Sequence, residues 1–241
     1  MSREQAGTQA FEFGARRRIL PALLALAGLC SCGSGSAPRD PSKTQATSQS
    51  APGASQATNE NRFYSAVGGV SIEKLPSWSF MPLEFELQNR EAVSVGKKET
   101  DAAMHDSTTP PLVVIARFPE PSDKPNPTLK INRRALGDLQ GAAPVEITRQ
   151  VVMVMANAVP SFQLDDEIRE AEIGGFPAGA FRAHFTIEVP RLGRSFTVRT
   201  QGFIVPRGNY GLIIAASDPT DGAENYEADF QAMVKTIVID K

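Results

Sequence analysis

The 241-residue sequence predicts an α+β fold in which an antiparallel β-sheet packs against helices. Three successive segments in the C-terminal third alternate apolar and polar residues, which is typical of antiparallel strands with one buried face. Residues 145–159 and 223–235 instead space their apolar residues as a helix does. With 41% hydrophobic and 22% charged residues, the composition is that of a globular protein and excludes collagen-like, coiled-coil, multi-span membrane and wholly disordered chains.

The charge balance predicts no nucleic-acid partner. The 25 Lys and Arg residues are outnumbered by 27 Asp and Glu residues, which gives a formal net charge of −2. Nucleic-acid binding usually requires a clustered basic excess, and the sequence has none.

Residues 1–31 are typical of an export signal. A basic cluster, residues 16–18, precedes a mostly apolar run, residues 19–29, that is shorter than the about 20 residues a membrane-spanning helix needs. The sequence Leu29-Cys30-Ser31-Cys32 that follows resembles the bacterial lipobox, with Cys32 as the acceptor. The resemblance implies cleavage before Cys32 and a diacylglycerol on its thiol. Cys30 does not fit, because the large Leu29 stands where a small residue is needed, and residues 33–241 contain no cysteine for a disulfide.

Two export routes stay open. Arg16-Arg17-Arg18-Ile19-Leu20 resembles a twin-arginine signal, while a Sec signal with one additional arginine explains the same residues. Gly33, and not Asp, follows Cys32, so nothing marks retention in an inner membrane. We expect the bacterial cell envelope as the location, with the periplasmic side of the outer membrane as the default in a cell with two membranes.

Residues 32–61 are expected to form the lipidated cysteine and a disordered tether. From Gly33 to Asn61 the chain has no Val, Ile, Leu, Met, Phe, Tyr or Trp. Such a segment buries too little apolar surface to offset the loss of chain entropy on folding. We therefore expect a folded domain at residues 62–241.

The N-terminal half of this domain predicts strands, helices and two irregular segments. The proposed helix at residues 82–95 has an alternative, because the alternation of Leu83, Phe85 and Leu87 also fits a strand. Strands are predicted at residues 63–67, 70–75, 111–118 and 126–133, a Gly-Gly turn at 68–69, a polar loop or frayed helix at 96–109 and a stiff proline-rich connection at 119–127.

Alternation within residues 126–133 predicts a half-exposed strand. Leu129 and Ile131 should face the core, and Lys130 and Asn132 should face water. The C-terminal half should then contain a buried helix at 145–159 with Met153 and Met155 in the core, strands at 181–189, 196–200 and 210–216, a helix at 223–235 and a short strand at 237–239.

Several segments together resemble the Mog1/PsbP-like fold. The segments are residues 69–76 with Trp78, 126–131, 173–178 and 202–214. The resemblance spans essentially all of residues 62–241 and implies an α/β/α sandwich, with the antiparallel sheet between helices. It also implies a family of accessory and binding proteins, which has no catalytic motif to carry over to this chain.

Residues that carry chemistry are few. His105 and His184 have no second ligand at metal spacing, and nucleophile-elbow, P-loop, zincin and dinucleotide-binding patterns are absent. We predict no catalytic, cofactor or metal residue. Five acids, Asp165, Asp166, Glu167, Glu170 and Glu172, are interpreted as a solvated strand edge, with a Ca²⁺ site as the alternative. The predicted hairpin beside them carries Arg182, Arg191, Arg194 and Arg199, so charge polarity across the sheet would favour a protein partner.

These observations predict a membrane-anchored envelope lipoprotein with a non-enzymatic accessory or protein-binding domain. Its partners would be the membrane, through the lipid at Cys32, and an envelope protein. The alternative is a small-molecule or metal-binding lipoprotein associated with transport, which would need a cavity lined by Trp78 and other aromatic residues. An enzyme is the third hypothesis, since acid–base chemistry would depend on Asp and Glu pairs that show no diagnostic spacing.

Overall fold

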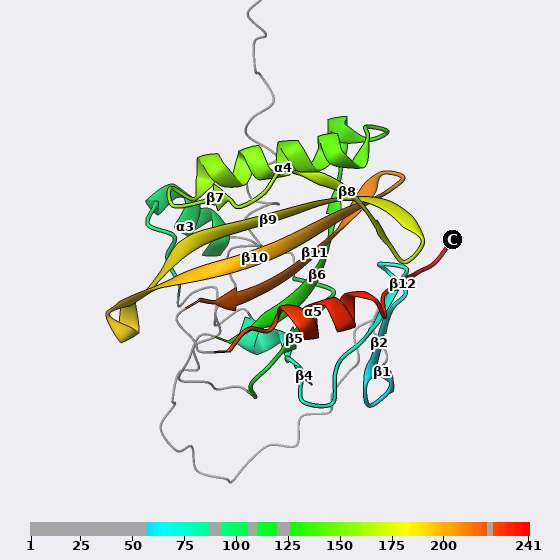
Figure 1. The fold of residues 1–241 in the computed structure, drawn as a ribbon, viewed down its shortest axis with the longest axis horizontal. Coiled ribbons are helices and arrows are strands. Elements are labelled where there is room, and N and C mark those ends of the chain that lie inside the picture. The colour runs from blue at the N-terminus through cyan, green and yellow to red at the C-terminus, as the bar shows by residue number, and fades with distance from the viewer. Residues whose placement is uncertain (1–56, 87–92, 106–109, 120–125, 221–223) are drawn as a thin grey trace, which may run out of the picture.

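A computed structural model of the chain describes residues 57–86, 93–105, 110–119, 126–220 and 224–241 (Figure 1). The helices are α3 (Lys98–His105), α4 (Pro144–Ala158) and α5 (Glu227–Val234). The strands are β1 (Ala57–Asn59), β2 (Arg62–Ser65), β3 (Val70–Glu73), β4 (Ser79–Phe80), β5 (Val113–Ala116), β6 (Thr128–Ala135), β7 (Gln163–Leu164), β8 (Arg169–Ile173), β9 (Phe176–Val189), β10 (Arg194–Arg207), β11 (Tyr210–Pro219) and β12 (Val238–Ile239).

A large antiparallel sheet forms the centre of the molecule. Its strand order is β4-β5-β6-β11-β10-β9-β7, and β8 also pairs with β9. The predicted meander is confirmed, because β9, β10 and β11 pair in sequence along most of their lengths. The turns that join them contain Gly193 and Gly208, each at a φ of 58°, a left-handed conformation that glycine adopts without steric cost.

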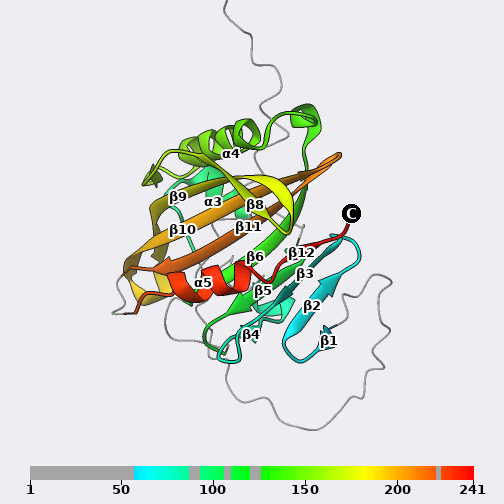
Figure 2. The same cartoon turned by 45° about the vertical axis from the view of Figure 1, so that its right-hand side comes forward.

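Both faces of the large sheet are covered, as Figures 1 and 2 show. On one face, α4 packs on β9 and β10 through a core that includes Ile147, Met155 and Phe185. On the other face, α5 packs through a core that includes Trp78 and Phe230. We call these the α4 face and the α5 face. The predicted α+β fold, with a sheet between helices, is confirmed.

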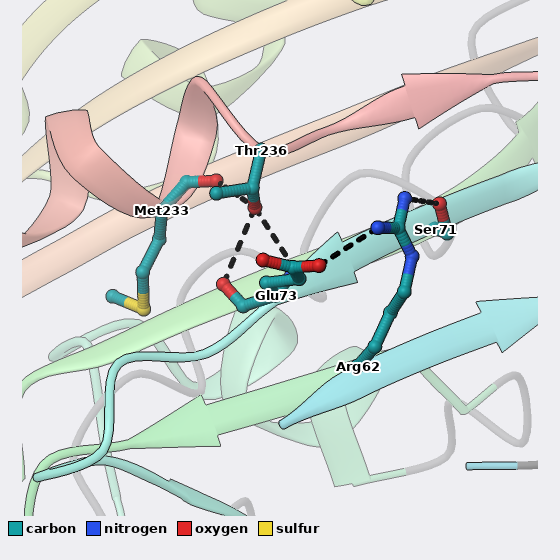
Figure 3. Close-up of polar contacts among 5 residues, drawn as sticks. All are labelled: Arg62, Ser71, Glu73, Met233 and Thr236. Atoms are coloured by element: carbon teal, nitrogen blue, oxygen red, sulfur yellow. Dashed lines mark hydrogen bonds and ion pairs between the residues drawn. The ribbon is translucent and has the colours of Figure 1, made fainter. Parts of the chain in front are cut away.

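A second, four-stranded sheet with the order β1-β2-β3-β12 lies at the C-terminal end of α5 (Figure 2). Thr236, which follows α5, bonds this sheet, because its Oγ1 accepts a hydrogen bond of 2.9 Å from the main-chain nitrogen of Glu73 (Figure 3). The Glu73 carboxylate in turn accepts a bond of 2.7 Å from Arg62, which also donates to Ser71. β1 pairs with β2, so this sheet includes residues N-terminal to the boundary at residue 62 that the sequence predicts.

The predicted helix at residues 82–95 is wrong at its C-terminal end. Residues 83–86 are helical, but Ser94 forms a β-bridge with Glu188 of β9. The following polar segment contains α3, where Asp101 accepts hydrogen bonds from the Ser94 hydroxyl, at 2.7 Å, and from the main-chain nitrogen of Val95, at 2.8 Å. The ends of the proline-rich connection are joined, since the Asn126 side chain bonds both the main-chain nitrogen and the carbonyl of Phe118, and the main-chain nitrogen of Arg117 donates to the carbonyl of Pro127.

Helix α4 confirms the predicted helix at 145–159 to within one residue at each end. It begins at Pro144, in the first turn, where the missing N–H costs no hydrogen bond. Met155 is buried in the α4-face core as predicted, but Met153 is 42% exposed, so its assignment to the core is wrong. The helical rotation between these residues carries Met153 away from the sheet.

Candidate functional site

An open pocket lies on the α5 face of the large sheet, beside the N-terminus of α5. Its volume is about 200 Å³. We call it the α5 pocket. It is lined by Asp165, Asp166, Arg182, Arg199, Thr200, Gln201, Ala216, Asp218, Asn225, Glu227 and Phe230.

Strand register brings the charged side chains of this pocket together. Arg199 of β10 lies opposite Asp218 of β11 on one side and opposite His184 of β9 on the other. Gln201, the next residue of β10 on the α5 face, lies opposite Arg182 of β9. Residues of neighbouring strands that lie directly opposite point to the same face, so all of these side chains face α5.

Each of the two arginines in the pocket bonds a carboxylate. Arg199 donates to Asp218 at 2.9 Å, and Arg182 donates to Glu227 in the first turn of α5. These pairs correct the predicted charge polarity across the sheet, because they neutralise two of the hairpin's four arginines with acids from α5 and β11. The Arg182–Glu227 pair is exposed, and pairs of this kind contribute about 0–1 kcal/mol, so it orients α5 more than it stabilises it.

The carboxyl of Asp218, whose side chain is 8% exposed, lines the pocket. Burial raises its pKa above the ordinary value of 3.8, while the bond from Arg199 and the backbone N–H of Tyr226 act in the opposite direction. Burial, with a hydrogen bond to Glu224, also raises the pKa of Tyr226 to about 12, so its hydroxyl stays protonated at neutral pH and donates to Glu224.

His184 is half-exposed on β9. Its Nδ1 lies 2.5 Å from a carboxylate oxygen of Asp165, in the exposed acidic segment between β7 and β8. Asp165 and Asp166 line the α5 pocket, whereas Glu170 and Glu172 lie exposed on β8. Among the described residues no group of three or more His, Cys, Asp and Glu side chains is placed to hold a metal ion. The side chain of His105 lies outside the described residues.

Trp78, expected to line a ligand cavity, is instead a core residue that is 1% exposed. Its ring lies edge-on to Tyr226, with centroids 5.9 Å apart, and 5.4 Å from the ring of Phe230. Its Nε1 donates a hydrogen bond of 2.9 Å to Asp229 of α5. The cavity that the small-molecule alternative needs is therefore filled by aromatic side chains and by α5.

The sequence did not predict a buried ion pair on the α4 face. Nζ of Lys130 lies 2.7 Å from both carboxylate oxygens of Glu86, and each residue is 1% exposed. Asn132 is 2% exposed, and neither polar atom of its side chain has a hydrogen-bond partner among the described residues. The predicted exposure of Lys130 and Asn132 is therefore wrong, because the second face of the sheet is also covered.

One signal could have located the Arg199–Asp218 pair. The predicted turn leaves Gly208 and Asn209 between the strands, and a two-residue turn pairs Arg207 with Tyr210. Counting eight residues outward from each member of that pair places Arg199 opposite Asp218. No comparable count links Lys130 to Glu86, which lies outside the sheet.

The predicted lipidation site, Cys32, lies outside the described residues, as does the proposed tether as far as residue 56. None of the helices within the described residues is both long enough and apolar enough to cross a bilayer.

No protein-family model and no curated protein sequence matches the chain. Among solved structures it is similar to cyanobacterial PsbP (CyanoP) from Synechocystis sp. PCC 6803, at 8% identity and a TM-score of 0.47, over 78% of this chain and 98% of that one. LpqN, involved in cell envelope biogenesis of Mycobacterium tuberculosis, aligns at 13% identity and a TM-score of 0.44, over 80% and 88%.

A protein from Bacteroides thetaiotaomicron VPI-5482 aligns at 13% identity and a TM-score of 0.41 over 75% of this chain. The chain spans about half of that longer protein, 48% of its length. Because every one of these TM-scores lies below 0.5, the α+β assignment is based on the strand order and pairing given above.

The α5 pocket is suited to polar recognition. Its two arginines and the carboxylates of Asp218 and Glu227 are already hydrogen-bonded to one another, so they present fixed donors and acceptors. A protein surface that offers complementary polar groups can bind at such a rim without a large change in the pairs.

Proposed function

We propose that the chain is a membrane-anchored envelope lipoprotein whose folded domain is a non-enzymatic accessory or protein-binding module. The observation that carries the proposal is the sequence Leu29-Cys30-Ser31-Cys32 at the end of an apolar run, followed by a segment without large apolar residues. Two or three acyl chains at Cys32 would anchor the protein durably, since each buried methylene contributes about 0.8 kcal/mol. The resemblance to Mog1/PsbP-like accessory proteins supports the same function.

Two features of the folded domain support a binding role. The aromatic side chains around Trp78 fill the interior of the α5 face, which argues for recognition at the surface. The rim of the α5 pocket presents exposed acids, Asp165 and Asp166, next to arginines held in ion pairs. Fixed polar groups of this kind favour a partner with complementary charge.

Lipid attachment is tested with two matched cysteine variants. Cells that express the full chain are fed an alkyne-tagged fatty acid, and the protein is partitioned in Triton X-114. Cys32→Ser should lose the label and move to the aqueous phase, whereas Cys30→Ser should keep both properties. Equal labelling of the wild type and Cys32→Ser would contradict the anchor.

The export route is tested separately by replacing Arg16 and Arg17 with lysine. Loss of export would support the twin-arginine route, and unchanged export would support the Sec route.

The binding role is tested with photo-crosslinking residues in intact cells. A crosslinker at Asp166, on the rim of the α5 pocket, should give a discrete adduct with an envelope protein. A crosslinker at Met153, exposed on α4 across the sheet, serves as the control and should give none. Adducts of equal yield at both positions, or at neither, would contradict recognition at the α5 pocket.

A further inference from the structure

A second open pocket lies at the other end of β10 and β11, at the turn that joins them. Its volume is about 450 Å³, and it is lined by Phe176, Pro206, Arg207, Gly208 and Tyr210. We call it the turn pocket. None of its lining residues is acidic.

Two guanidinium groups lie over aromatic rings of this pocket: Arg207 lines the pocket itself, and Arg133 lies next to it, over the ring of the lining residue Tyr210. Cζ of Arg207 is 3.9 Å from the ring centroid of Phe176, and Cζ of Arg133 is 4.2 Å from that of Tyr210. Nη2 of Arg207 also donates to the main-chain carbonyl of Asp240 at 2.5 Å. Stacking engages the face of a guanidinium and leaves the N–H groups at its edge free to donate. Both groups are therefore oriented in advance and retain hydrogen-bond donors.

Neither of these groups forms an ion pair with an acidic side chain among the described residues. Within the part of the chain that the structure describes, neither Arg133 nor Arg207 lies within 4.0 Å of an acidic side chain. The carboxylate of Asp240 instead accepts a bond of 3.0 Å from Tyr64. Other arginines of the domain do pair with acids, namely Arg62, Arg149, Arg182 and Arg199.

We propose that the turn pocket binds a phosphate group. The edges of Arg207 and Arg133 would donate to different oxygens of the tetrahedral anion, whereas a planar carboxylate fits the fork of one arginine. The rings of Phe176 and Tyr210 would contact the apolar part of a phosphate ester. The phosphate would come from a soluble ester or from the headgroup of an anionic phospholipid. The site lies far in sequence from Cys32 and does not depend on lipid attachment.

The test uses the full chain with Cys32→Ser, so that no acyl chain contributes to membrane binding. Inorganic phosphate and glycerol phosphate are titrated at constant ionic strength by calorimetry. Flotation with phosphatidylglycerol vesicles, against phosphatidylcholine vesicles, tests the lipid source. Binding of soluble phosphate alone would support a soluble ester, and flotation that free phosphate competes away would support the headgroup.

Arginine variants assign the binding to the turn pocket. Arg207→Gln and Arg133→Gln should each weaken phosphate binding by about tenfold, which is the loss expected for one charge-assisted hydrogen bond. Arg194→Gln is the matched control, because Arg194 lies on the same strand, 5.1 Å from the ring of Phe196, and outside the pocket. Thermal unfolding checks that each variant is folded, and Arg207→Lys, which keeps the charge and loses the fork, replaces Arg207→Gln if that variant is not.

Three results would overturn the proposal. They are the absence of binding by every phosphate probe, equal binding of acetate and phosphate, and equal affinity of the Cys32→Ser protein with and without Arg207→Gln or Arg133→Gln. The phosphate test uses only Cys32→Ser proteins, whereas the Triton X-114 test measures the lipid on the wild type. A negative phosphate result therefore leaves the Triton X-114 result unchanged, and the two proposals fail independently.

Discussion

The buried ion pair between Lys130 and Glu86 is the most informative place to perturb the domain. Both charges are removed from water, with Nζ 2.7 Å from each carboxylate oxygen and both residues 1% exposed. Lys130→Met keeps most of the side-chain volume and removes the ammonium group that lies 2.7 Å from the buried carboxylate of Glu86. Glu86→Leu does the reverse. The double variant removes both charges and replaces them with apolar groups.

The expected free energies follow from the cost of burying charge. Removing one partner of a buried pair costs about 3–5 kcal/mol, whereas replacing both with apolar residues of similar volume is often neutral or stabilising. For a domain of this size, 1 kcal/mol corresponds to a shift in Tm of about 2–4 °C. Each single variant should therefore lose about 6–20 °C, and the double variant should recover most of that loss.

The assay is a double-mutant cycle by urea denaturation at neutral pH, with circular dichroism as the probe. Its readout is the interaction energy, which is the double-variant change minus the sum of the single changes. Lys74→Met is the control, because Lys74 bonds Asn61 at the surface, and it should change the free energy of unfolding by less than about 0.5 kcal/mol. Single variants that cost less than about 1 kcal/mol, or costs that simply add, would refute this reasoning.

Three further changes test neighbouring features. Asn132→Leu should raise the free energy of unfolding by about 1–3 kcal/mol, because the wild-type amide is buried and forms no hydrogen bond to any residue that the structure describes; a loss measured by urea denaturation would contradict this. Gly179→Ala should cost about 1–3 kcal/mol, since the new Cβ would lie 2.6 Å from a main-chain oxygen of α4, and an unchanged Tm would count against that contact. Burial raises the pKa of Asp218, so the folded state binds this proton more tightly and the Asp218 contribution to stability falls as pH rises through the raised pKa. The stability of Asp218→Asn relative to the wild type should therefore increase from about pH 4 to about pH 7 in urea denaturation, and a constant difference would contradict the shift.

The sequence predicted the meander because alternation and turn glycines act locally. Residues 181–189 alternate without interruption, and the turn at Gly208 sets the register of the strands that flank it. Helix α4 was equally predictable, since its flanking prolines and helical spacing agree. The same local signals contain no information about what covers each face. Lys130 and Asn132 alternate with apolar residues, which is the pattern of a strand with one exposed face. Both side chains are nevertheless buried, because the α4 face of the sheet is covered as well.

The sequence also could not predict a strand that pairs through its backbone and has no alternation of apolar side chains. Strand β1 contains no large apolar residue and is recognised only by its pairing with β2. Glu86 follows Leu83 and Phe85, residues that fit both a helix and a strand, so neither its face nor its partner could be assigned. The partner is set by how residues 83–86 pack over the sheet, which is a tertiary contact.

The two pockets on the α5 face divide the arginines of the large sheet into two kinds. At the α5 end of β10, Arg199 and its neighbour Arg182 are neutralised by carboxylates. At the turn end, Arg207 and Arg133 lie on aromatic rings and, among the described residues, pair with no acid. The charge polarity inferred from the sequence therefore runs along the strands and not across the sheet. An ion pair uses the hydrogen-bond donors of a guanidinium group, whereas stacking on a ring leaves the N–H groups at the edge of the guanidinium free. Anions should therefore be attracted to the turn end of the strands, and polar protein surfaces to the α5 end.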